Sequence, residues 1–319
     1  MKRSHLLLLV TLVLGGRAWP QSSALPKDGV AYSLHGALFI KDASGKTVRV
    51  IKTTTPIGSF AISPDRKITV FAPPGPEQNG GPLYLLSFST GRIKRLTHTT
   101  VYDKREVYAY PDFSPDGRWV VFAIHAQPRG DAVITSGPYG LIDLKTEFMR
   151  VLPSTGNIDN GYGPAYGSPP RWSPNGQRIF VNLEGDLGLT SPSGKHLLNI
   201  SMSTHWITPP MDVFAVDWLG NSCVIFIGGK PWKKAQEQSA WVLNLRTHRT
   251  ERLDKLLGVA PVRVTNLLAF SPTIMVRKAG NKLVVETQSG TWNIEDADPY
   301  PNVRVFSAWT QAQVPTTCR

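Results

Sequence analysis

The stretch Asp112-Phe-Ser-Pro-Asp-Gly117 is repeated, with variations, at four other places in this chain. They read Phe60-Ala-Ile-Ser-Pro-Asp65, Arg171-Trp-Ser-Pro-Asn-Gly176, Asp217-Trp-Leu-Gly-Asn221 and Ala269-Phe-Ser-Pro272. Each runs into a stretch of β-branched or aromatic residues, and successive copies lie about 50 residues apart, which is the sign of a propeller or another repeat array.

The repeated phrase has the chemistry of a tight corner between two strands. Proline fixes φ at the first turn position, and Asp followed by Gly suits the corner itself. In the fullest copy, residues 110–113 end one strand and residues 118–123 form the returning strand. We therefore expect each copy to join two inner strands of a blade, with the aromatic residue before Ser filling the gap between neighbouring sheets.

A second repeat alternates with these corners and consists of a strand, a short polar turn and another strand. It occurs over residues 37–50, 83–96, 140–152, 187–198, 241–253 and 283–294. Six outer hairpins and five inner ones leave one blade incomplete, and residues 303–310 and 29–33 have the composition to complete it. The sequence thus predicts an all-β fold, a six-bladed β-propeller of four-stranded antiparallel blades, closed by N- and C-terminal strands that share one blade. Helical turns are expected only over residues 235–240 and 251–257.

These repeats resemble the TolB-like six-bladed propeller family, whose repeats are WD40-like. The resemblance rests on the phrases at Ser63, Ser114 and Ser173, the aromatic residue before Ser, and the hairpins that end at residues 96, 152 and 253. It covers about residues 29–310 and implies the fold more specifically than any function. TolB carries an α/β domain before its propeller, for which we expect no room here because blade signals begin near residue 29.

The N-terminus resembles a secretory signal. Lys2 and Arg3 precede an apolar run over residues 6–14, and small residues permit cleavage after Ala24 or Ala18. This run is far shorter than the ~20 residues that span a bilayer. We expect residues 1–24 to be a signal peptide and residues 25–319 to be a single propeller domain. The mature protein should be exported, either to a periplasm or into the medium, with no transmembrane span.

Two cysteines, Cys223 and Cys318, are present. In an oxidising compartment they can pair and tie the C-terminal tail to the body of the protein. The alternative is that Cys223, within Cys-Val-Ile-Phe-Ile, is a buried strand residue and that Cys318 is a free thiol. The sequence leaves both possibilities open.

Charge and loop length together predict a binding face. The formal net charge is +12, and it is still +9 without Lys2, Arg3 and Arg17, which favours anionic partners. In a four-stranded meander the long connections fall on one face, and long loops on a rigid scaffold often carry function. The expected contact residues on this loop face are basic or aromatic, namely Lys104, Arg105, Arg129, Trp206, Lys230, Trp232, Lys233 and Lys234.

The favoured function is a non-enzymatic, monomeric protein-binding or scaffold module, whose partner is a protein of the cell envelope with an acidic surface. No nucleic-acid-binding motif is present. The sequence also lacks Gly-x-Ser-x-Gly, His-Glu-x-x-His, Cys-x-x-Cys and phosphate-loop motifs, so it indicates no catalytic residue, cofactor or metal ligand. Two alternatives stay open. One is a glycan- or peptide-acting hydrolase or lyase, marked by ionisable groups with perturbed pKa values at the axial mouth. The other is a sensor that holds a small anion in the central channel.

Overall fold

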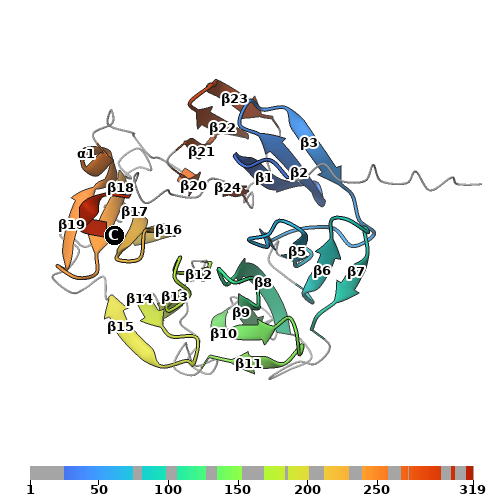
Figure 1. Cartoon of the computed structure of the whole chain (residues 1–319), viewed down its shortest axis with the longest axis horizontal. Coiled ribbons are helices and arrows are strands. Elements are labelled where there is room, and N and C mark those ends of the chain that lie inside the picture. Colours follow the sequence, from blue (N-terminus) through green and yellow to red (C-terminus); the bar gives the residue numbers. More distant parts are fainter. Residues whose placement is uncertain are drawn as a thin grey trace, which may run out of the picture.

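The described strands form six four-stranded antiparallel sheets around a central axis (Figure 1), which confirms the predicted propeller. The structure is a computed structural model that describes residues 25–74, 81–97, 106–126, 135–152, 169–183, 186–200, 212–229, 239–257, 267–271, 273–295, 303–305 and 314–318. The predicted signal peptide, residues 1–24, and all eight predicted loop-face residues lie outside this part of the chain.

Each blade runs from an inner strand at the axis to an outer strand at the rim. The first three blades are β24 (Val303–Val305), β1 (Gly29–Leu34), β2 (Ala37–Asp42) and β3 (Thr47–Ile51); β4 (Phe60–Ile62), β5 (Ile68–Phe71), β6 (Tyr84–Ser87) and β7 (Ile93–Arg95); and β8 (Glu106–Phe113), β9 (Trp119–Ala126), β10 (Thr135–Asp143) and β11 (Met149–Val151). The other three are β12 (Arg171–Trp172), β13 (Ile179–Leu183), β14 (Asp186–Thr190) and β15 (His196–Ile200); β16 (Asp212–Leu219), β17 (Cys223–Gly229), β18 (Ser239–Asn244) and β19 (Arg249–Arg252); and β20 (Leu267–Phe270), β21 (Ile274–Ala279), β22 (Lys282–Thr287) and β23 (Gly290–Ile294).

The first blade closes the ring as the sequence predicted. Strand β24, near the C-terminus, pairs antiparallel with β1, near the N-terminus, and Arg304 lies opposite Ala31. This pairing gives β1 a neighbour on its axial side, so the two ends of the propeller are held in one sheet.

The corner phrase is held by its serine. The hydroxyl of Ser114 accepts a hydrogen bond from the backbone N–H of Trp119 at 2.8 Å and donates one to Asp116. Ser63 makes the same pair of bonds with Ile68 and Asp65. The serine hydroxyls lower the pKa values of both aspartates, so these carboxylates stabilise turns, as the sequence indicated.

Hydrophobic clusters between neighbouring blades form the core. Phe113 packs with side chains of the second blade, Trp172 with the third and Trp218 with the fourth. The sequence predicted this role for the aromatic residue of the phrase. Burying one such side chain contributes roughly 1.5–3 kcal/mol.

One helical expectation is confirmed, and the described end of the other is wrong; its residues 235–238 lie outside the described part of the chain. The helix α1 (Leu253–Leu257) lies within the predicted stretch and packs beside β18 and β19. Ser239 and Ala240, expected to end a helical turn, instead begin β18, because Ala240 pairs with Ile227 and is buried in the fifth blade. Within the described residues, no helix has the length and apolarity needed to cross a membrane.

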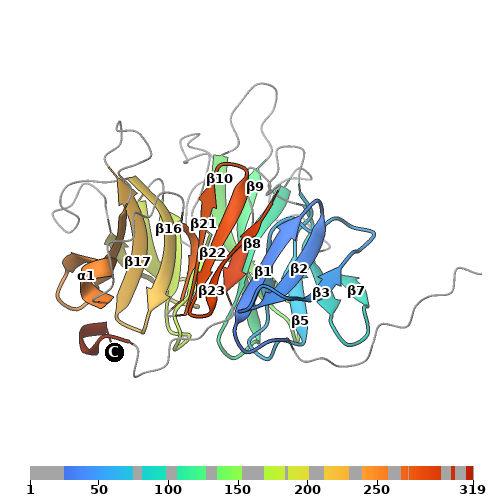
Figure 2. The same cartoon turned by 90° about the horizontal axis from the view of Figure 1, so that it is seen from above.

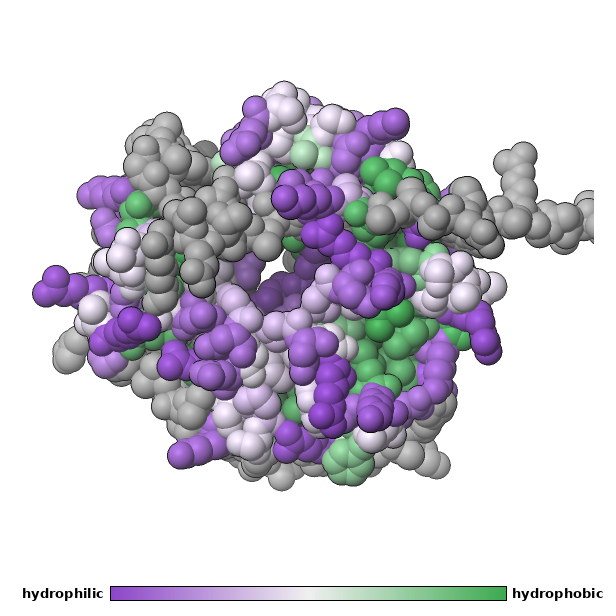
Figure 3. Space-filling model, viewed as in Figure 1, coloured by the Kyte–Doolittle hydropathy of each residue, from purple (hydrophilic) through white to green (hydrophobic). Residues whose placement is uncertain are grey.

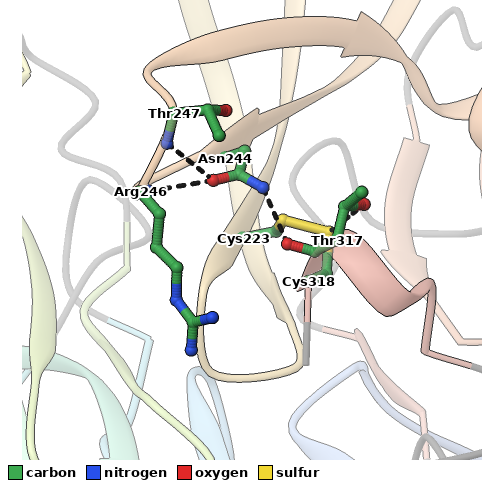
Figure 4. Close-up of a disulfide and its surroundings, with 6 residues drawn as sticks. All are labelled: Cys223, Asn244, Arg246, Thr247, Thr317 and Cys318. Atoms are coloured by element: carbon green, nitrogen blue, oxygen red, sulfur yellow. Dashed lines mark hydrogen bonds between the residues drawn. A yellow bond between two sulfur atoms is a disulfide. The ribbon is translucent and has the colours of Figure 1, made fainter.

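The two cysteines form a disulfide, with an S–S distance of 2.09 Å and a sequence separation of 95 residues. Cys318 ends the short 3₁₀ helix η3 (Thr316–Cys318), and Figure 2 shows this end of the chain beside the fifth blade. The side-chain amide of Asn244 donates a hydrogen bond to the carbonyl of Thr317 at 2.7 Å (Figure 4). The tail is therefore fastened to the fifth blade, although β24 belongs to the first.

Candidate functional site

Every innermost strand places one residue at an equivalent position of its sheet, and we call these six residues the axial ring. The equivalence follows from the strand register. Each of the six pairs with a residue of the second strand, and that residue pairs with a residue of the third strand that lies two positions before the turn to the outermost strand. In blade order the ring consists of Arg304, Ala61, Asp112, Arg171, Asp217 and Ala269. Figure 3 shows an opening at the centre of the propeller with hydrophilic residues around and inside it.

Arg304 is fixed by groups of two other blades. Its Nε donates to the carbonyl of Phe60 at 3.2 Å, and its Nη2 donates to the carbonyl of Pro111 at 2.8 Å. Its Nη1 lies 3.5 Å from Oδ1 of Asp112. The guanidinium reaches past the second blade, whose ring residue is the small Ala61. Arg304 therefore has the contacts of a structural clamp.

A bulge in β8 positions the groups of the third blade that Arg304 contacts. The pairing of β8 with β9 shifts between Ala109 and Asp112, and Tyr110 has a φ of 53°. The N–H of Tyr110 donates to the hydroxyl of Ser59 in the loop before β4, at 3.0 Å. Positive φ is uncommon for a residue other than glycine, and bulges often redirect side chains next to functional sites. Here the bulge lies next to the Pro111 carbonyl and the Asp112 carboxylate that Arg304 contacts.

Asp112 is also committed to the fold. Its Oδ2 accepts a hydrogen bond from the backbone N–H of Trp172 at 2.9 Å, and its Oδ1 lies 3.9 Å from Nη1 of Arg171. With Arg304 on the same oxygen, the carboxylate links three blades. Its side chain is 19% exposed, so water contributes little to balancing its charge.

Arg171 and Asp217 retain unused hydrogen-bonding capacity. Nη1 of Arg171 donates to the carbonyl of Pro170 at 3.2 Å, and Oδ1 of Asp217 accepts from the N–H of Trp218 at 2.8 Å. Across the described part of the chain, Asp217 makes no other hydrogen bond, and no ion pair joins it to Arg171. The indole Nε1 of Trp218 donates to the Arg171 carbonyl at 3.2 Å, which ties the strands that carry both groups.

Electrostatics distinguishes Asp217 from ordinary surface carboxylates. Burial among the blades raises its pKa, and the positive charge of Arg171 opposes this only in part. The Asp217 side chain is nevertheless solvent-exposed, so the blades that surround the carboxylate do not close it off. Burial and the neighbouring Arg171 lower the pKa of Arg304 to about 10, so Arg304 stays charged at neutral pH.

The sequence interpretation did not identify the axial ring. The eight loop-face residues that it named instead lie outside the described part, so that expectation stays a prediction. A signal for the ring was present, because three phrases carry Asp, Arg and Asp at the position directly before their aromatic residue. The described residues include no group of three or more His, Cys, Asp or Glu side chains that could hold a metal ion.

Comparisons with known proteins support the fold. No protein-family model matches the sequence, and no curated protein sequence matches it significantly. Among solved structures, an oligogalacturonate lyase in complex with manganese has a TM-score of 0.53 at 12% identity, over 82% of this chain and 71% of that one. The oligogalacturonate lyase of Vibrio parahaemolyticus has a TM-score of 0.53 at 11% identity, over 87% and 81%. The hydrazine synthase of Kuenenia stuttgartiensis has a TM-score of 0.50 at 13% identity, over 82% and 75%.

Proposed function

We propose that this protein is an exported, TolB-like propeller that acts as a binding module, and that a ligand enters its axial channel and contacts Arg171 and Asp217. The observation that carries the proposal is that the four charged residues of the ring differ in how fully they are paired and hydrogen-bonded. Arg304 and Asp112 satisfy each other and the backbone, whereas Arg171 and Asp217 keep free donors and acceptors beside an open channel. The Arg171 side chain is only 15% exposed, and an enclosed charge without full pairing is unfavourable. Its retention beside the exposed carboxylate of Asp217 supports a functional role.

Export is supported by two features. The signal-like N-terminus precedes the propeller, and the Cys223–Cys318 disulfide suits an oxidising compartment. Expression of the full chain in a Gram-negative host, followed by fractionation and intact-mass measurement, tests this. Mature protein beginning at Leu25 in the periplasm or medium is expected. Unprocessed protein that stays in the cytoplasm would contradict export.

The channel site can be tested without knowing the ligand. The purified mature protein is incubated with a small-molecule extract of the cell envelope and examined by native mass spectrometry. A bound mass that is lost in both Arg171→Gln and Asp217→Asn is expected. Arg277→Gln is a matched control, because Arg277 pairs with Glu286 at 3.0 Å outside the ring. A bound mass retained in both ring variants, or no bound mass at all, would contradict the channel site.

A protein partner at the loop face remains part of the proposal. Crosslinking mass spectrometry in an envelope extract, with Lys230, Lys233 and Lys234 reversed in charge, tests it separately. A single dominant partner lost in this variant is expected. A partner that persists would show that the loop face is not the contact surface.

Catalysis is a second candidate function, and Asp217 is the observation that favours it. A glycosidase needs two working carboxylates, and Asp112 is committed to two arginines and a backbone N–H. A lyase needs one base and a cation for the substrate carboxylate, which Asp217 and Arg171 could provide. Asp217 would remove the proton next to that carboxylate, the electron pair would form the C=C bond as the C–O bond to the leaving sugar breaks, and water would protonate the leaving oxygen.

The similarity to two oligogalacturonate lyases supplies the substrate for a direct test. Mature protein is mixed with oligogalacturonate, and the ultraviolet absorbance of an unsaturated product is followed over time. Activity that disappears in Asp217→Asn would establish the lyase function. An unchanged absorbance, with and without added manganese, would leave binding as the function of the channel.

A further inference from the structure

We propose that the channel ligand is a small organic acid that carries a hydrogen-bond donor, a hydroxyl or an ammonium group, close to its carboxylate. This inference rests on the proposed function and names the ligand class for the same site. Arg171 would hold the carboxylate, and Asp217 would accept the donor.

The charge balance of the ring is the first step. The Arg304–Asp112 ion pair removes one positive and one negative charge from those available to a ligand. What remains is one guanidinium and one carboxylate on neighbouring blades, with no direct ion pair between them in the described structure. A ligand with only an anionic group would leave Asp217 without an ionic partner. A simple cation would leave Arg171 with only its long contact to Asp112, at 3.9 Å. A ligand with both kinds of group satisfies both residues.

The fixed spacing of the two residues is the second step. The hydrogen bond from the Trp218 indole to the Arg171 carbonyl couples β16 to β12 at 3.2 Å. Trp218 is 3% exposed and packs against the fourth blade, so its ring is held in place. Because Asp217 is next to Trp218 in sequence, its carboxylate is positioned relative to Arg171. A preorganised pair of this kind selects a ligand by the separation of its two groups.

Space in the ring is the third step. On one side Arg304 crosses past Ala61 and occupies that sector. On the other side the sixth blade contributes Ala269, which is partly exposed and has no atom beyond Cβ to fill the sector next to Asp217. The ligand would therefore occupy the Ala269 side, so Ala269→Leu should block it without removing a polar group.

Four compounds with one three-carbon skeleton test the class. Lactate and alanine carry a carboxylate with a hydroxyl or an ammonium group, propionate carries only the carboxylate, and isopropylamine carries only the ammonium. Binding to the mature, disulfide-bonded protein is measured by ligand-observed NMR titration. We expect lactate, alanine or both to bind about tenfold or more tightly than the two single-group compounds, since a hydrogen bond to a charged group is worth that much.

Variants of the ring residues distinguish a hydroxyl donor, as in lactate, from an ammonium donor, as in alanine. Arg171→Gln and Ala269→Leu should each weaken the preferred compound about tenfold or more, while Arg277→Gln should leave it unchanged. Asp217→Asn should weaken alanine more than lactate, because an amide can still accept from a hydroxyl but cannot pair with an ammonium charge.

Two results would overturn the ligand class. If propionate binds as tightly as lactate and alanine, the donor is not recognised. If none of the four binds while an extract component is still lost in the ring variants, the class is wrong although the channel site stands. Loss of the channel site itself would appear separately, in the extract experiment.

Discussion

Arg304 and Asp112 lie two blades apart in the axial ring, and yet Nη1 of the arginine is 3.5 Å from Oδ1 of the aspartate. The blade between them contributes Ala61 to the ring and the Phe60 carbonyl to the guanidinium. The innermost strand β24 has only three residues, Val303–Val305. The side chain of Arg304, at the centre of β24, thus connects the closing strand of the first blade to the second and third blades. It is the structural clamp of the ring.

Arg304→Ala should lower the free energy of unfolding by about 3 kcal/mol, because it leaves the enclosed Asp112 carboxylate without its nearer cation. The loss is measured by urea unfolding. Lys67→Ala is the control: Lys67 pairs with Asp65 at 3.7 Å, but its side chain is 79% exposed, so the change should stay within about 0.5 kcal/mol. Equal losses of unfolding free energy in the two variants would show that Arg304 is not a structural clamp.

Asp217→Asn should stabilise the protein at neutral pH. Burial raises the folded-state pKa of Asp217 above its unfolded value. The folded protein therefore binds the proton more tightly. The stability due to this proton is fully present below the unfolded pKa, about 4, and is lost as pH rises through the folded pKa.

The measurement is the difference in melting temperature between Asp217→Asn and wild type from pH 3.5 to 8. This difference should be small at the acidic end and grow in favour of the variant as pH rises. Groups with lowered pKa values, such as Asp65 and Asp116, destabilise both proteins alike in acid and cancel in the comparison. A difference that does not vary with pH would mean that Asp217 is not perturbed.

Removing the disulfide should destabilise the native state. A disulfide typically contributes roughly 2–4 kcal/mol to stability, and a long closed loop lies toward the upper end of that range. The double variant Cys223→Ser/Cys318→Ser should therefore melt several degrees lower. Adding dithiothreitol should shift the wild type toward the variant and leave the variant unchanged. If the reductant shifts both proteins equally, its effect does not come from this bond.

The fold could be predicted from the sequence because its signals are local and repeated. A serine that binds the N–H five residues later, as Ser114 binds Trp119, leaves a phrase that can be recognised in one stretch of chain. The shared closing blade also followed from the sequence. The sequence left open whether Cys223 and Cys318 pair, and the structure shows that they do.

The axial ring could not be predicted from such local patterns. The hydrogen bond from Arg304 to Pro111 joins residues 193 positions apart, and no local pattern specifies it. Tyr110 is a further case, because a residue before proline normally adopts extended backbone, whereas tertiary contacts such as the hydrogen bond to Ser59 accompany its φ of 53°. The sequence placed function on long loops that lie outside the described residues, so that expectation stays a prediction. The four charged residues of the ring come from four separate inner strands, and no single stretch of sequence shows that they meet.

Gly220→Ala should release the C-terminal tail from the fifth blade. Gly220 has a φ of +65°, and a Cβ there would lie 2.5 Å from the carbonyl oxygen of Cys318. Gly280→Ala is the matched control, since its φ is +61° and no atom lies within 4 Å of a Cβ at that position. Both variants incur the penalty of a positive φ, roughly 1 kcal/mol, and only Gly220→Ala also displaces the tail. Faster carboxypeptidase removal of the C-terminus and faster reduction of the disulfide are expected in Gly220→Ala alone. Identical behaviour of the two variants would show that the tail does not depend on this close contact.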